Sequence, residues 1–230
     1  MSSPAASFYF DLASPLAYLA AERILHVFPW PAEWKPVLAC ELAGAETPPG
    51  AGGAPSQDDS LPARERPDDE LLRAQVERRA GELGLQPVRW PEPFPFDSSL
   101  AMRVATYAAS IGRAVPFAQA AFRQAFAGGH SLENPDFVLI AAAACEMHPT
   151  AVLRAAQTRA VQERLTATTA TAASIGVREV PALVVPLRGR CGELVFVGER
   201  ELERAATSVR AKTDGPQGAW ANRWAGAPSM

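Results

Sequence analysis

The sequence is poor in cysteine and histidine, and neither residue type occurs in a functional spacing. Cys40, Cys145 and Cys191 are far apart, so there is no C-x-x-C motif, and neither a local dithiol pair nor a zinc knuckle is expected. The three histidines are also isolated and lack the usual metal-ligand spacings. We therefore expect three reduced, buried thiols and no metal centre.

Long hydrophobic runs and an excess of positive charge are also missing. No apolar stretch approaches the roughly 20 residues that span a bilayer, and residues 1–7 lack the basic patch and apolar core of a secretory signal. A net charge of −3 provides no general attraction to nucleic acid or anionic membranes. We expect a soluble cytoplasmic protein with no nucleic-acid and no membrane partner.

The apolar patterns predict strands at both ends of the chain and helices between them. The strands are expected at 7–11, 34–38, 180–185 and 193–197, the last two as an antiparallel hairpin. A first helix is predicted at 15–27, a helical block at 68–174 and a last helix at 199–209.

This order of elements predicts an α/β protein with a thioredoxin-like fold and an inserted all-helical domain. The thioredoxin-like part would comprise residues 1–42 and 175–211, and the inserted helical domain residues 68–174. Residues 43–67, rich in Gly, Pro and Ala, are expected to form a mobile surface loop. Residues 212–230 are expected to form a mobile tail.

Local signals also place helix ends within the helical block. Asp97 or Ser98 is expected to cap a helix that contains Leu100, and the next helix is predicted from Phe117. Asn134 followed by proline has the order of a cap and a first helical turn. Residues 149–174 are predicted to be helical with one break.

The most informative segment is FYFDLASPLAYL at residues 8–19, where the first strand meets the first helix. Ser14 is a favoured N-cap, and Pro15 suits the first helical position because its missing N–H is not needed there. The Ser14 hydroxyl would then lie at the positive end of a helix, which stabilises an anion such as a thiolate. A plain helix cap at Ser14 and a plain turn residue at Asp11 remain as alternatives.

Residues 8–20 resemble the opening of the 2-hydroxychromene-2-carboxylate isomerases and kappa-class glutathione transferases, which belong with the DsbA-type oxidoreductases. The segment from Gly176-Val177 to Val180-Pro181 is similar to the Val–Pro signature of that family, although Pro181 could also be an ordinary strand-start proline. Further similar landmarks are Trp34-Lys35-Pro36, Phe94-Pro95 and Phe196-Val197-Gly198. The resemblance extends from Ser7 to Val209.

The resemblance implies a glutathione-dependent isomerase that acts on an aromatic or unsaturated carboxylate, a small-molecule substrate, and that forms a homodimer. Glutathione would bind with its sulfur near Ser14. In the oxidoreductases a C-P-x-C motif begins the first helix, whereas here Ser14 and Ala17 replace the two cysteines. Disulfide exchange needs two thiols and is therefore not expected.

The resemblance also implies which residues form the site. A cis peptide before Pro181 would present the backbone of Val180 to the ligand. The implied glutathione-binding residues are Asp11, Pro15, Val180, Pro181, Gly198, Glu199 and Arg200. The expected substrate contacts are Tyr18, Trp90, Phe94 and Asp97, with core packing as the alternative for Trp90 and Phe94.

Several glutathione anchors of that family have no counterpart in this sequence. The expected Asn before the prolines at 48–49 is missing, no lysine occurs between Lys35 and Lys212, and Glu199-Arg200 replaces an Asp-Arg pair. Each lost charge-assisted hydrogen bond costs about 1.5–3 kcal/mol. A kappa-class-like glutathione transferase and a non-catalytic thioredoxin-fold binding protein therefore remain alternatives.

Overall fold

The computed structural model describes residues 6–43, 67–187 and 192–213. The predicted loop at 43–67 and the predicted tail at 212–230 lie almost entirely outside these ranges. Among the described residues, no helix is long and apolar enough to cross a membrane.

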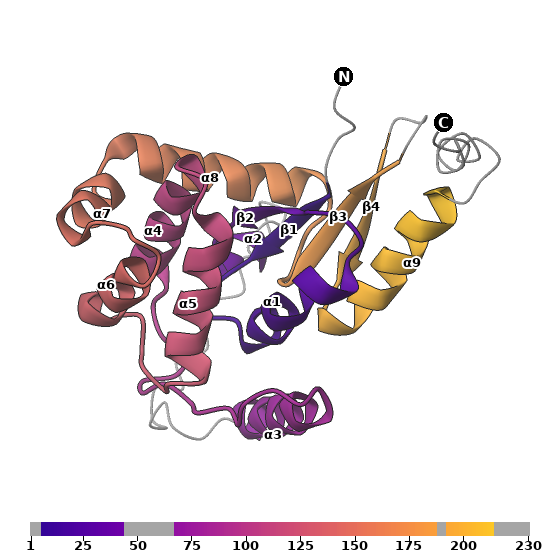
Figure 1. Ribbon diagram of the computed structural model, residues 1–230, viewed down its shortest axis with the longest axis horizontal. Helices are drawn as coiled ribbons and strands as arrows, with labels where there is room; N and C mark the ends of the chain where they lie inside the picture. The colour runs from indigo at the N-terminus through magenta and orange to yellow at the C-terminus, as the bar shows by residue number, and fades with distance from the viewer. Residues whose placement is uncertain (1–5, 44–66, 188–191, 214–230) are drawn as a thin grey trace, which may run out of the picture.

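A four-stranded mixed sheet in the order β2-β1-β3-β4 forms the centre of the fold (Figure 1). Its strands are β1 (Ser7–Phe10), β2 (Glu33–Pro36), β3 (Ala182–Pro186) and β4 (Glu193–Val197). β1 pairs with β2 in parallel and with β3 antiparallel, so that Phe8 lies opposite both Trp34 and Leu183. The predicted hairpin of β3 and β4 is confirmed. The sheet thus joins the two ends of the described chain.

Helices fill the long segment between β2 and β3, and Figure 1 shows α4–α8 gathered beside the sheet, with α3 on the far side of α1. The helices before β3 are α1 (Pro15–Val27), α2 (Ala39–Ala43), α3 (Pro67–Glu82), α4 (Ser99–Ser110), α5 (Ala114–Phe126), α6 (Pro135–Ala143), α7 (Pro149–Ala156) and α8 (Arg159–Ser174). After β4 come the short 3-10 helix η2 (Glu199–Glu201) and α9 (Leu202–Thr213). This is the predicted thioredoxin-like arrangement with helices inserted between its two parts.

The two faces of the sheet bury different clusters because side chains alternate along a strand. Phe8 and Phe10 belong to the large core shared with α1 and α5, where the Phe10 and Phe122 rings lie 5.9 Å apart. Tyr9 points to the opposite face and joins a smaller cluster that contains Val177 and Val184. The sheet is therefore covered on both sides. The loops that form the candidate site follow β1 and β2 and precede β3.

Local capping signals predicted several helix starts correctly. α1 begins at Pro15, and α6 begins at Pro135 with the Asn134 side chain accepting a hydrogen bond from the Asp136 N–H at 2.9 Å. The predicted break in 149–174 falls at residues 157–158, where Thr158 caps α8 and accepts from the Val161 N–H.

Other boundaries differ from the prediction. β2 ends at Pro36 because the chain turns into α2, a five-residue helix that the sequence pattern did not predict. β3 begins at Ala182, since proline at 181 has no N–H for the ladder. α5 begins at Ala114, three residues before the predicted start, and the last helix divides into η2 and α9.

Candidate active site

Ser14 lies between the start of α1 and the loop before β3. Its Oγ accepts a hydrogen bond from the Ala17 N–H at 3.2 Å, as expected of an N-cap. The same hydroxyl donates to the Val180 carbonyl at 3.4 Å, across 166 residues of sequence. The peptide bond between Val180 and Pro181 is cis, as the resemblance implies. The fold therefore brings the two predicted halves of the site into contact.

The Ser14 hydroxyl opens into a cavity of about 340 Å³ at the C-terminal ends of β1 and β2. This volume is typical of sites for small molecules, which span about 300–1,000 Å³. The cavity is lined by Asp11, Ala13, Ser14, Leu38, Ala39, Cys40, Phe96, Asp97, Ser98 and Ser99. Three segments that are distant in sequence thus form one pocket around the hydroxyl.

Asp11 lines this cavity and connects its segments. Its buried carboxylate accepts hydrogen bonds from the Ala13 N–H at 2.9 Å, the Ala39 N–H at 2.9 Å and the Ser98 hydroxyl at 2.8 Å. Burial raises the pKa of the Asp11 carboxyl, and these hydrogen bonds oppose the increase. With all three partners supplied by the chain, Asp11 holds the walls of the cavity in place.

Asp97 and Ser98 stand at the start of α4, but their roles differ from a simple cap. Ser98 occupies the N-cap position with a helical backbone (φ −87°, ψ −2°) and makes no capping hydrogen bond, and its hydroxyl donates to Asp11. Asp97 accepts from the Ser99 N–H at 2.8 Å and from the Ser99 hydroxyl. These hydrogen bonds lower the pKa of the Asp97 carboxyl. Asp97 therefore brings a stable negative charge to the wall of the cavity, where it was predicted to contact substrate.

The three aromatic residues predicted to contact substrate do not line this cavity. Tyr18 is only 2% exposed and stacks on Phe126 at 5.6 Å. Trp90 and Phe94 pack against each other at 4.9 Å and against the large core, which is the packing role left open for them in the sequence. Phe96, which was not predicted, is the aromatic residue that reaches the cavity.

No residue of the predicted glutathione-binding run at 198–200 lines this cavity. The Gly198 N–H donates to the Pro181 carbonyl at 2.8 Å, which links the run to the loop before β3. Arg200 is exposed and lies 3.5 Å from the Glu199 carboxylate. Pro15 is buried as the first residue of α1.

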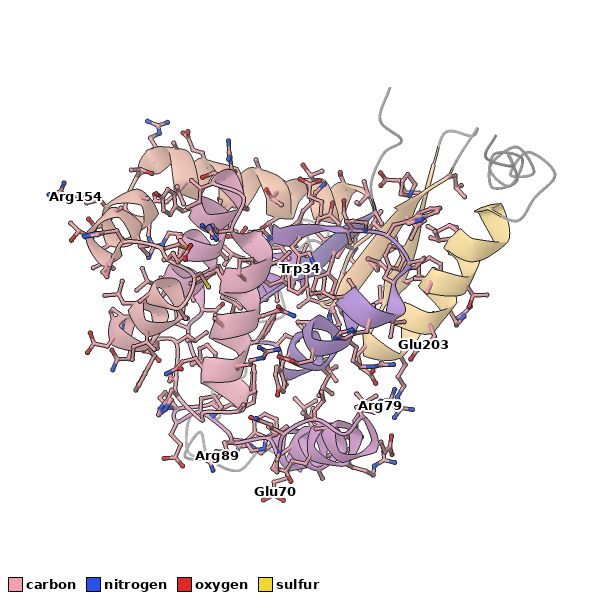
Figure 2. All side chains as sticks on the ribbon, viewed as in Figure 1. Trp34, Glu70, Arg79, Arg89, Arg154 and Glu203 are labelled. Carbon is pink, nitrogen blue, oxygen red and sulfur yellow. The ribbon has the colours of Figure 1, made fainter. Side chains whose placement is uncertain are left out.

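Glu199 itself is the acceptor of an ion-pair cluster. Its buried carboxylate accepts from Arg23 of α1 at 3.0 Å and from Arg79 of α3 at 2.7 Å. Figure 2 shows Arg79 reaching from α3 toward α9, where Glu203 also pairs with Arg23. Because both Glu199 oxygens are occupied, this carboxylate holds α1, α3 and η2 together, and its predicted contact with glutathione stays a prediction.

Cys40 is another residue of the cavity that sequence reasoning missed. Its thiol is exposed, which corrects the expectation of three buried cysteines, whereas Cys145 is buried as expected and Cys191 lies outside the described residues. The signal for residues 38–40 was available, because residues that follow neighbouring parallel strands meet at the same edge of a sheet. Among the described residues, no group of His, Cys, Asp or Glu could hold a metal ion.

With this geometry established, comparisons with known proteins classify the chain. The sequence profile of the family described as DSBA-like thioredoxin domain matches residues 6–210. This chain belongs to that family. A comparison with curated protein sequences found no match.

Solved structures with a similar fold include both isomerases and reductases. A 2-hydroxychromene-2-carboxylate isomerase has a TM-score of 0.73 and 18% identity, covering 94% of this chain and 98% of its own. The cytosolic disulfide reductase DsbM from Pseudomonas aeruginosa has a TM-score of 0.59 and 13% identity, covering 94% of this chain and 100% of the DsbM chain. The structure of DsbM with GSH has a TM-score of 0.58 and 14% identity, covering 92% of this chain and 98% of the DsbM chain. At these identities the likeness shows that this DsbA-like domain shares their fold.

Proposed function

We propose that this DsbA-like protein is a glutathione-dependent isomerase of the 2-hydroxychromene-2-carboxylate type. The observation that carries the proposal is the position of the Ser14 hydroxyl, at the start of α1, 3.4 Å from the Val180 carbonyl and open to the cavity. Serine and alanine at positions 14 and 17 leave no dithiol for disulfide exchange. The enzyme would act on a small-molecule substrate as a cytoplasmic homodimer.

The residues around Ser14 fit a thiol ligand. When bound, glutathione would supply a nucleophilic thiolate. The hydroxyl donates only a long hydrogen bond to Val180, so it can turn toward an anion at little cost. Its oxygen keeps the bond from the Ala17 N–H, and the positive end of α1 also favours negative charge. These groups would lower the pKa of a thiol placed beside Ser14.

The backbone beside Ser14 would hold the peptide part of the ligand. Once the serine hydroxyl turns away, the Val180 carbonyl is available to accept from a ligand amide, as in the addition of a short strand. Asp97, kept ionised by its bonds from Ser99, would repel a second carboxylate and would favour the end of the ligand that carries an ammonium group. Arg200, exposed beyond Gly198, would be available to a ligand carboxylate.

A glutathione transferase is the second candidate, and the open cavity favours it over a purely structural domain. Such an enzyme would need the same Ser14 hydroxyl and the same cavity. Absorbance assays with 2-hydroxychromene-2-carboxylate and with a chloronitrobenzene distinguish the two reactions, since the isomerase converts the first compound and the transferase consumes the second.

Calorimetry with reduced glutathione tests the proposal before any substrate is known. We expect binding to the native protein and weaker binding to Ser14→Ala. Alkylation of Cys40 in a protein without the other two cysteines is expected to block binding, because this thiol lies in the same cavity. Absence of binding at millimolar glutathione would support the non-catalytic alternative.

A further inference from the structure

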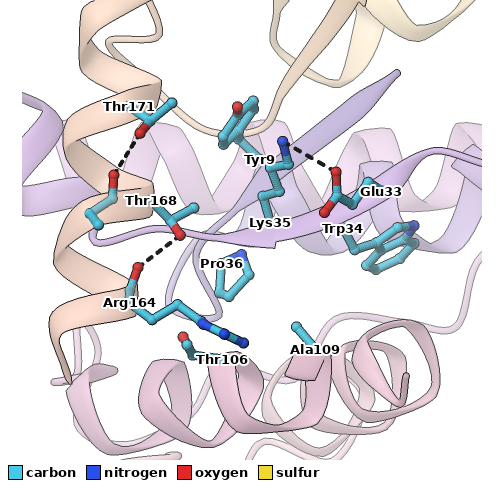
Figure 3. Close-up of a pocket in the computed structure, with 11 residues that line it drawn as sticks. Tyr9, Glu33, Trp34, Lys35, Pro36, Thr106, Ala109, Arg164, Thr168 and Thr171 are labelled. Atoms are coloured by element: carbon cyan, nitrogen blue, oxygen red, sulfur yellow. Dashed lines mark hydrogen bonds and ion pairs between the residues drawn. The ribbon is translucent and has the colours of Figure 1, made fainter. Parts of the chain in front are cut away.

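We propose a second ligand site, in a cavity of about 390 Å³ between β2, α4 and α8, for a small acid that also carries hydroxyl groups (Figure 3). The cavity shares no lining residue with the Ser14 cavity. It is lined by Tyr9, Glu33, Trp34, Lys35, Pro36, Thr106, Ala109, Arg164, Ala167, Thr168 and Thr171. The proposal does not depend on glutathione binding.

Arg164 supplies an uncommitted positive charge to this cavity. Figure 3 shows its side chain extending from α8 beneath Pro36 toward α4. The adjacent acid, Glu163, is paired with Arg159 at 2.7 Å, and no ion-pair partner of Arg164 occurs within the described ranges. A guanidinium group matches the two oxygens of a carboxylate or phosphate. Arg164 is therefore placed to bind an acid group.

Lys35 supplies a second positive charge from β2. Its ammonium lies 3.3 Å from the carboxylate of Glu33, whose side chain is 65% exposed. Because Glu33 is exposed, this ion pair contributes little to stability, and the ammonium, which also lies 5.7 Å from the centroid of the Tyr9 ring, can bind another acid at low cost. With Arg164, the cavity holds two cations and one acid, Glu33, and its charge favours an anionic ligand.

Three threonine hydroxyls determine what else the ligand must carry. Thr106, Thr168 and Thr171 each donate at 2.8 Å to the carbonyl of the residue four positions earlier. Their protons are thus used within the helices, and their oxygen lone pairs remain as acceptors for the cavity. A ligand that satisfies them needs donors, such as the hydroxyl groups of a hydroxy acid or a sugar phosphate.

The outer edge of β2 adds backbone groups to the same site. The Glu33 N–H donates to the Ala6 carbonyl, directly before β1, at 2.8 Å, and the Val37 N–H donates to the Phe10 carbonyl of β1 at 3.1 Å. The parallel ladder alternates, so the N–H and carbonyl of Trp34 face away from β1, toward the outer edge of the sheet. Proline at position 36 offers no N–H there. The edge is therefore open to a small ligand and poorly suited to a further strand.

Calorimetric titration with L-malate, glucose 6-phosphate, inorganic phosphate and glucose tests the site in the full-length protein. We expect malate or glucose 6-phosphate to bind and glucose not to bind. Whichever of the two acids binds more tightly shows whether the site prefers a carboxylate or a phosphate ester. Inorganic phosphate is expected to bind more weakly, since it lacks the hydroxyl groups of a sugar. The result that would overturn the proposal is no binding of any acid at millimolar concentration.

Two variants and a matched control locate the site. Arg164→Met and Lys35→Met are each expected to weaken binding about tenfold or more, since each removes a charge-assisted hydrogen bond. Arg159→Met, on the same helix and 89% exposed, is expected to leave binding unchanged. Equal weakening by all three would indicate only nonspecific attraction and would overturn the proposal, as would unchanged binding to Arg164→Met. Circular dichroism confirms that each variant is folded.

Discussion

Replacing Ser14 with alanine separates its two roles, as a helix cap and as a donor to a thiolate. Loss of the bond from the Ala17 N–H at 3.2 Å costs about 1 kcal/mol of stability, as for other N-caps. The 3.4 Å bond to Val180 is long and adds little. We therefore expect Ser14→Ala to be folded and about 1 kcal/mol less stable in chemical denaturation.

Ser14→Ala is also expected to change the pKa of a thiol bound beside the hydroxyl. A hydrogen bond to a charged group is worth about 1.5–3 kcal/mol, which corresponds to about 1–2 pKa units at 1.36 kcal/mol per unit. The pKa of the thiol of bound glutathione, followed by the ultraviolet absorbance of the thiolate, should therefore rise by about 1–2 units in Ser14→Ala. Turnover near neutral pH should fall accordingly.

Thr158→Ala is the matched control. Thr158 also caps a helix, accepts from an N–H three residues later and donates to a backbone carbonyl, but it does not line the cavity. It should lower stability by a similar amount and leave the thiol pKa unchanged. An unchanged thiol pKa in Ser14→Ala, with bound glutathione in both proteins, would refute the role given to the hydroxyl.

Three further predictions concern the thiol position at Ser14, the two aspartates of the cavity and the ion pairs of Glu199 and Glu163. Ser14→Cys, in a background without the other cysteines, should have a thiol pKa below the usual value of about 8.5, measured by alkylation rate against pH. In carbon-13 NMR titrations the carboxyl of Asp11 should have a pKa above about 3.9, and that of Asp97 should have a pKa below it. Because the folded state holds the Asp11 proton more tightly than the unfolded state, the contribution of Asp11 to stability falls as pH rises through its folded-state pKa. Glu199→Gln should destabilise by about 1–3 kcal/mol, and Glu163→Gln, in an exposed pair, by less than about 0.5 kcal/mol.

Features set by local sequence were predictable. The start of α1 at Pro15 and of α6 at Pro135 follow from a cap residue and a proline that are adjacent in sequence. The contact between Ser14 and Val180 was expected only through the family resemblance, because residues 166 positions apart carry no local signal for it.

Features that depend on distant partners were missed or remained ambiguous. α2 is too short for periodicity, and its first N–H is held by Asp11, 28 residues away. Glu199 was expected near glutathione, but its carboxylate is bound by arginines 176 and 120 residues earlier. The aromatic character of Trp90 allowed both ligand contact and core packing, with packing favoured, and only the structure shows which surface its ring faces.

A crystal structure with bound glutathione tests the central claim most directly. We predict that the sulfur lies within hydrogen-bonding distance of the Ser14 Oγ, with the peptide part of the ligand beside the Val180 carbonyl. A sulfur bound beside Cys40 or outside the cavity, with the Ser14 hydroxyl still donating to Val180, would contradict it.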